Sequence, residues 1–237
     1  LKTFDAHVTL EAKKLKAAEL PALESLRVTA DLNDGVLALK PIDIGLAGGH
    51  VVGLFTLEGR QSPMASHASM ELIDVRLDKL LDRLKGAKTV GPFKGHVEMK
   101  GHGDSLAKIL ASASGSMAVV TASGGISNLL DAKVGLNGGK ILGLLITGDR
   151  AIGIKNAAAA FDFEQGLGKS KAILLDTDQT RTEGTGIIDL RDETVDVLLT
   201  PHPKKPGIFS LGSSIRVHGT IRQPKFSLVG KIAEKQE

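Results

Sequence analysis

Ser105 and Lys108 are the first pair of residues whose types and spacing could do chemistry. They match the Ser-x-x-Lys pattern of penicillin-binding enzymes, in which the serine is the nucleophile. With 15 serines and 21 lysines, the chain should contain this spacing about once by chance. No Ser-Asp-Asn accompanies the pair, and Lys88-Thr89 is followed by Val90 where the pattern requires glycine. The pair is therefore interpreted as part of a helix N-terminus and not as a catalytic site.

Two further motifs are incomplete. Gly166-Leu167-Gly168-Lys169-Ser170 resembles the end of a phosphate-binding loop, but Phe163 stands where the first glycine is required. The residues on both sides are strand-like, so no helix N-terminus is available for a phosphate, and the stretch is predicted to be a turn. Phe209-Ser210-Leu211-Gly212 lacks the first glycine of a nucleophile elbow, where Ile208 stands.

The seven histidines are scattered, and none has the i, i+4 spacing of a helical metal pair. His96, Glu98 and His102 share one side of a predicted strand, but solvated histidines are the ordinary case there. We therefore expect no catalytic residue, no metal and no cofactor, and a protein that is not an enzyme.

The composition excludes further classes. A chain without cysteine has no disulfide, thiol nucleophile, cysteine-ligated zinc or iron–sulfur cluster. Seven phenylalanines and no tryptophan or tyrosine argue against stacking platforms for nucleic acid or sugars. A net charge of +3 is too small to indicate a polyanionic partner, so nucleic acid is not expected. No apolar block approaches the roughly 20 residues that span a bilayer.

Alternation at period two is the dominant pattern. In the first segment Phe4, Val8 and Leu10 alternate with polar residues, and similar runs begin near Leu26, Phe93 and Ile215. Glycine- or asparagine-containing turns separate the runs. The sequence therefore predicts a mainly β fold, an antiparallel meander of long strands with one apolar and one polar face.

Three segments favour helices: Leu77 to Leu84, with leucines at i, i+3, i+4 and i+7, and the stretches near 105–113 and 126–147. We expect a β-rich segment over 1–103, a segment over 104–230 that continues the sheet and carries the last two of these helices, and a polar tail at 231–237. The apolar strand faces could form a sealed core or an open groove for acyl chains. Composition alone favours the sealed core, because large exposed apolar patches are generally avoided.

From about Ala111 onward, a series of short sequence motifs occurs in a fixed order over nearly half of the chain. They are Ser114-Gly115-Ser116, Gly125 to Leu130, Ile141 to Leu145, Ala157 to Phe163, Leu174 to Thr177, Gly184 to Thr194, Leu199, Pro201, Pro203-Lys204, Ser210-Leu211, Ile215 to Val217, Gly219-Thr220 and Pro224. This series resembles the C-terminal region of the AsmA family of bacterial envelope proteins, which are related to bridge-like lipid transfer proteins. The first 110 residues show the same pattern of long predicted strands but no sequence motif that is distinctive of the family.

The resemblance implies a periplasmic protein attached to the inner membrane by an N-terminal helix absent from this piece, with possible envelope protein partners. It also implies a long curved sheet, incompletely closed, that forms an apolar groove and moves phospholipid towards the outer membrane. This favours the open groove over the sealed core. Strand parity predicts the groove-lining residues as Phe4, Val8, Leu10, Leu26, Val28, Leu32, Phe93, Val97, Met99, Ile215, Val217 and Ile221. The alternative function is a non-catalytic scaffold for outer-membrane protein assembly, with no lipid inside.

Overall fold

The computed structural model describes residues 4–15, 23–76, 91–126, 152–178, 180–204 and 214–229. These residues form thirteen strands and one short helix. The elements are β1 (Ala6–Leu15), β2 (Leu23–Asn33), β3 (Val36–Leu46), β4 (Gly49–Glu58), β5 (Ala65–Val75), β6 (Phe93–His102), α2 (Leu106–Ala111), β7 (Ser114–Ile126), β8 (Ile152–Glu164), β9 (Leu167–Thr177), β10 (Thr180–Asp189), β11 (Thr194–Pro203), β12 (Ser214–Thr220) and β13 (Gln223–Val229).

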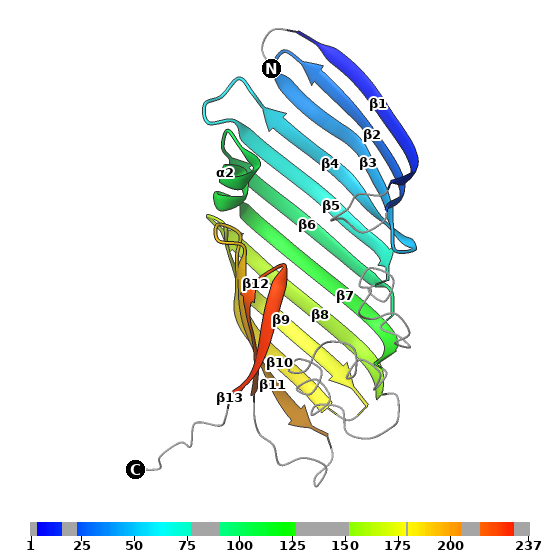
Figure 1. Cartoon of the computed structure of the whole chain (residues 1–237), viewed down its shortest axis with the longest axis vertical. Helices are drawn as coiled ribbons and strands as arrows, with labels where there is room; N and C mark the ends of the chain where they lie inside the picture. Colours follow the sequence, from blue (N-terminus) through cyan, green and yellow to red (C-terminus); the bar gives the residue numbers. More distant parts are fainter. Residues whose placement is uncertain are drawn as a thin grey trace.

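All thirteen strands belong to one antiparallel sheet, and their order in the sheet is their order in the sequence (Figure 1). The sheet is not closed, so β1 and β13 are its two edges. The predicted fold class is confirmed: a long antiparallel meander with very few helices. Each strand pairs with its sequence neighbours. Two-residue turns connect β2 to β3, β3 to β4, β8 to β9, β9 to β10 and β12 to β13, and longer segments connect the other pairs.

Tight turns of the type predicted from the sequence form at three hairpins. Asp34 and Gly35 connect β2 to β3 with φ angles of 45° and 75°. Ala47 and Gly48 connect β3 to β4 with 52° and 77°, and Gln165 and Gly166 connect β8 to β9 with 49° and 77°. Two successive residues with positive φ give the turn whose twist matches that of the flanking strands. The Gly166 stretch, which resembles part of a phosphate-binding loop, is therefore a hairpin turn that leads into β9, as predicted.

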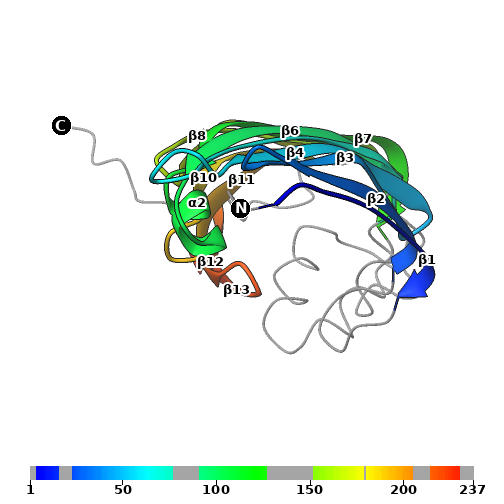
Figure 2. The ribbon, with the colours of Figure 1, turned by 90° about the horizontal axis from the view of Figure 1, so that it is seen from above.

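Figure 2 shows that the sheet is bent into an arch, with β10–β13 turned in under its concave side. The predicted helix near 105–113 is present as α2. The predicted helices at 77–84 and 126–147 and the tail at 231–237 lie outside the described residues, except Ile126, which ends β7. The expected division after residue 103 does not interrupt the sheet, because β6 pairs with β7.

No helix among the described residues is long and apolar enough to cross a membrane.

Candidate functional site: an apolar concave surface

One face of the sheet, here called the inner face, is apolar from β1 to β13. Residues paired across neighbouring strands point to the same side of a sheet, so the register traces this face from strand to strand. One row across the first eight strands consists of Leu10, Val28, Ile42, Gly53, Met70, Val97, Met117 and Phe161. Near the C-terminal edge, Val197, Val217 and Phe226 form an equivalent row.

Charged side chains are absent from the paired inner-face positions of the described strands. Buried strand side chains, including Leu32, Ile42, Phe163 and Ile215, lie on this face, whereas the buried Asp189 lies at the end of β10 on the other. Side chains on a concave surface converge and shield one another from water. The inner face is therefore the concave side of the arch in Figure 2.

The inner face contains a few hydroxyl groups, and those of Ser66, Thr121 and Ser170 are among the ones bonded to the backbone. Ser66 donates to the carbonyl of Gly101 at 3.1 Å, and Thr121 donates to the carbonyl of Pro92 at 2.9 Å. Ser170 accepts from the amide of Gly186 at 2.9 Å. Because these hydroxyls are satisfied within the sheet, they add little polarity to the surface. The inner face thus offers an apolar ligand contact area without reactive groups.

For most of the twelve residues predicted from the sequence, the alternation along the strand and the pairing between strands indicate the same face of the sheet. The residues that occupy paired inner-face positions are Val8, Leu10, Leu26, Val28, Leu32, Phe93, Val97, Met99, Ile215 and Val217. Phe4 precedes β1 and is exposed. Ile221 was expected to continue the alternation of β12, but that strand ends at Thr220 and Ile221 lies in the two-residue turn before β13.

Sequence reasoning missed the inner-face residues of β3–β5, such as Ile42, Phe55 and Met70. In β3 the alternation shifts between Leu39 and Ile42, where the register is irregular. A bulge inserts a residue and reverses the parity that follows it, so a period-two search loses the pattern. In β4 consecutive apolar residues occupy both faces, and the alternation is hidden.

The outer face carries cross-strand ion pairs and hydrogen bonds. Arg27 Nε lies 2.9 Å from Glu11 Oε1, and the ring of His50 is hydrogen-bonded to Asp43, with Nδ1 2.7 Å from Oδ1. His67 bonds Glu98, and this hydrogen bond is the main reason why the pKa of Glu98 is lowered. Such exposed pairs contribute little stability individually, but opposite charges on neighbouring strands favour this register. The two faces therefore differ in chemistry: apolar inside and charged outside.

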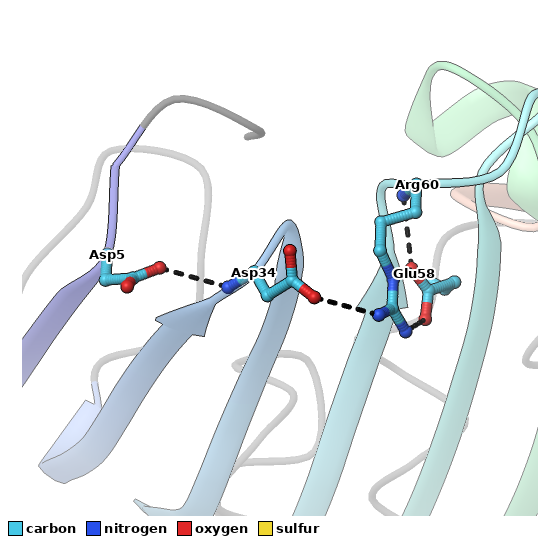
Figure 3. Close-up of polar contacts among 4 residues, drawn as sticks. All are labelled: Asp5, Asp34, Glu58 and Arg60. Carbon is cyan, nitrogen blue, oxygen red and sulfur yellow. Dashed lines mark hydrogen bonds and ion pairs between the residues drawn. The ribbon is translucent and has the colours of Figure 1, made fainter.

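One rim of the arch is held together by contacts between successive turns. Figure 3 shows a polar chain in which the amide of Asp34 donates to Asp5, Asp34 bonds Arg60 and Arg60 bonds Glu58. The amide of Gly59 donates to the carbonyl of Gly35 at 2.9 Å. The contacts tie the β2–β3 turn to the β4–β5 turn.

The same arrangement occurs again between the β8–β9 and β10–β11 turns. Asp189 accepts from the amide and the side chain of Arg191, as Glu58 does from Arg60. The amide of Leu190 donates to the carbonyl of Gly166 at 2.8 Å. The same contact pattern, a carboxylate that accepts from the amide and side chain of the arginine two residues later, thus occurs at two distant places on the rim. Together with the backbone hydrogen bonds between turns, it fixes the spacing of successive hairpins along this edge of the groove.

The Glu58–Arg60 contact predicts an acid-dependent contribution to stability. The hydrogen bond from Arg60 lowers the pKa of Glu58 from 4.5 to about 2. A carboxylate with a lowered pKa stabilises the folded state above its ordinary pKa, and the stabilisation is lost as pH falls through the folded-state value. The difference in free energy of unfolding between the wild type and Glu58→Gln should therefore shrink between pH 4.5 and about 2, as denaturant unfolding at several pH values would measure.

Arg60→Ala is the matched control for this experiment, because it removes the partner and leaves the carboxylate. It should lose the same pH-dependent component as Glu58→Gln. A difference between wild type and Glu58→Gln that is independent of pH over this range would contradict the assignment.

Ser105 caps α2, as the sequence predicts. Its Oγ accepts from the amide of Lys108 at 3.3 Å, and its backbone is extended with φ −147° and ψ 158°. Lys108 Nζ lies 2.8 Å from Asp104 Oδ2. Both members of the Ser-x-x-Lys pair are therefore engaged in the first turn of the helix.

The cap predicts the effect of substituting Ser105. Ser105→Ala should lower the free energy of unfolding by about 1 kcal/mol, the usual value of an N-cap side chain. Ser105→Asp should retain wild-type stability, because aspartate caps helices equally well. Denaturant unfolding measures both. A hydrolytic activity abolished by both substitutions would instead identify Ser105 as a nucleophile.

His96, Glu98 and His102, the candidate metal ligands considered from the sequence, do not form a metal site. Among the residues that the structure describes, no three histidine, aspartate or glutamate side chains lie close enough to hold a metal ion. The other sequence candidate, Ser210, lies outside the described residues.

Comparisons with known proteins give one family. A sequence model described as the AsmA family matches residues 1–172. The chain is also 28% identical over 223 residues to a protein named AsmA family protein YhjG from Escherichia coli (strain K12). That alignment covers 94% of this chain but 32% of the relative, so the chain spans about a third of the relative's length. No solved structure matches. The family match includes the first 110 residues, in which sequence analysis found no distinctive signature.

Proposed function

This chain belongs to the AsmA family, and we propose that its inner face binds the acyl chains of phospholipids and helps to move them between the inner and outer membranes. The observation that carries the proposal is the uncharged inner face, continuous over thirteen strands of an open sheet. In this proposal the chain lies in the periplasm and is attached to the inner membrane through a segment of the longer protein. Envelope-related functions of the family support this location.

Hydrophobic burial is sufficient to hold an acyl chain on such a surface. Transfer of each methylene group from water to an apolar environment is favourable by about 0.8 kcal/mol. The alternation places Val28 and Val97 towards the chain and leaves Thr29 and His96 in water. No catalytic group is needed, since the lipid is carried unchanged. The polar head group remains at the open side of the groove, in contact with solvent.

Site-specific photo-crosslinking in cells tests the proposal. A photoreactive amino acid at Val97 should label phospholipid, whereas the same residue at the neighbouring His96 should not, because the two side chains lie on opposite faces. Native mass spectrometry of the gently purified chain should show bound phospholipid. Labelling from His96 alone would overturn the assignment of faces. A protein free of lipid in both experiments would instead favour the scaffolding function.

A further inference from the structure

A cleft of about 450 Å³ lies on the outer side of the rim that carries the β4–β5 and β8–β9 turns, next to α2 (Figure 1). Its floor is a row of residues on four adjacent strands, Thr56, His67, Lys100 and Ser114, which the strand pairing places opposite one another. These are outer-face positions, because the next residue of β6 before Lys100 is the inner-face Met99. The cleft is therefore separated by the sheet from the surface proposed to bind acyl chains.

The serine hydroxyls beside α2 already have partners within the protein. Ser112, which ends α2, donates to the carbonyl of His102 at 2.7 Å. Ser114 accepts from the amide of Gln165 at 3.1 Å. These bonds tie β6, the segment after α2 and the β8–β9 turn to one another. The wall of the cleft on this side is thus held in place before any ligand binds.

The carboxylates near the cleft are also engaged. Glu58, which lines it, accepts from Arg60 Nη2 at 2.7 Å, and this contact lowers the pKa of Glu58 to about 2. Glu98, two residues before Lys100 on β6, is hydrogen-bonded to His67. Within the described part of the chain, neither carboxylate forms an ion pair with Lys100. Lys100 is therefore left without a counterion from these groups.

Four side chains that line the cleft have no hydrogen-bond or ion-pair partner among the residues that the structure describes: Thr56, Lys100, His102 and Gln165. Each of them can donate a hydrogen bond, and lysine is cationic at neutral pH. The polar groups of the cleft thus divide into bonded groups that form its wall and unbonded donors around one ammonium group. Such a set of donors is complementary to an anion with several acceptor oxygens.

We propose that the cleft binds a phosphate group, with Lys100 as the charged ligand and Thr56, His102 and Gln165 as hydrogen-bond donors. A phosphate monoester has three acceptor oxygens and nearly two negative charges, so it uses this set more fully than a carboxylate does. The volume also accommodates a small organic group attached to the phosphate. A soluble phosphate ester and a phospholipid head group both present this chemistry. The site goes beyond the proposed function, because it lies on the other face of the sheet and does not depend on acyl-chain binding.

Titration of the unmodified chain with inorganic phosphate at constant ionic strength, followed by amide NMR, tests this proposal. The amide signals of Lys100, Gly101 and Ser114 should shift on binding. Lys100→Gln should weaken binding by about tenfold or more, because a hydrogen bond to a charged group is lost. Lys94→Gln is the matched control, since Lys94 lies on the outer face of the same strand but 3.7 Å from Asp74, and it should bind as the wild type does. No shift, or equal weakening in both variants, would overturn the proposal.

Vesicles of phosphatidylcholine with and without phosphatidic acid identify the source of the phosphate. Sedimentation only with vesicles that contain phosphatidic acid, lost in Lys100→Gln and kept in Lys94→Gln, would support the site and identify a lipid head group. Phosphate binding without vesicle binding that depends on Lys100 would support the site and identify a soluble ester. A chain that binds phosphate but gives no lipid crosslink from Val97 would overturn the proposed lipid function and leave this site intact.

Discussion

Val28→Asp is expected to abolish the binding of phospholipid. Val28 pairs with Leu10 and Ile42 on the inner face, so a carboxylate there would have to give up its hydration against an acyl chain. The penalty for desolvating an ion in a protein is several kcal/mol. A loss of about 3 kcal/mol corresponds to roughly a hundredfold weaker binding. Native mass spectrometry and titration with a fluorescent phospholipid measure the effect.

Thr29→Asp is the matched control, because Thr29 is the next residue of β2, pairs with Thr9 and bonds it on the outer face at 3.2 Å. The two variants carry the same charge one residue apart, and only the inner-face variant should lose lipid. Val28→Leu should bind as the wild type does. Circular dichroism confirms that each variant is folded. Equal lipid binding by Val28→Asp and Thr29→Asp would contradict a role of the inner face.

Gly115→Ala should cause the largest loss of stability. Gly115 pairs with Met99 and Phe163 in the middle of the sheet and has a φ of +152°. A Cβ atom there would collide with the carbonyl oxygen of Glu98 and lie 3.0 Å from Cα of Met99. Backbone atoms of a paired strand cannot move away cheaply. We expect a loss of about 3 kcal/mol in free energy of unfolding, measured by denaturant unfolding.

Gly219→Ala separates the steric collision of the new Cβ atom from the backbone strain of a positive φ. Gly219 also has positive φ, at +108°, but the nearest atom to its Cβ position lies at 3.5 Å. Only the backbone strain remains, and it is about 1–2 kcal/mol. Gly115→Ala should therefore be clearly the more destabilising of the two. Similar losses for both variants would show that steric contact with β6 is unimportant.

Much of the sheet could be predicted, because the alternation of apolar and polar residues and the turn residues are local properties of the sequence. Alternation in β1, β2, β6 and β12 predicted strands and their apolar faces, and Asn33-Asp34-Gly35 predicted a turn. Prediction failed where a local irregularity changes the parity, as between Leu39 and Ile42. It also failed at Ile221, since the point at which β12 ends depends on its pairing with β13.

The sequence by itself determined that one face of a long antiparallel sheet is apolar and the other charged, and that no cysteine chemistry is available. Those properties follow from residue type and period-two spacing. Only the tertiary structure decided which side chains of the apolar face are buried. Val8 and Ile215 have the same pattern in the sequence, yet one is 57% and the other 1% exposed. Exposure depends on the place of a strand in the sheet, because β1 is paired on one side only, whereas β12 lies between β11 and β13.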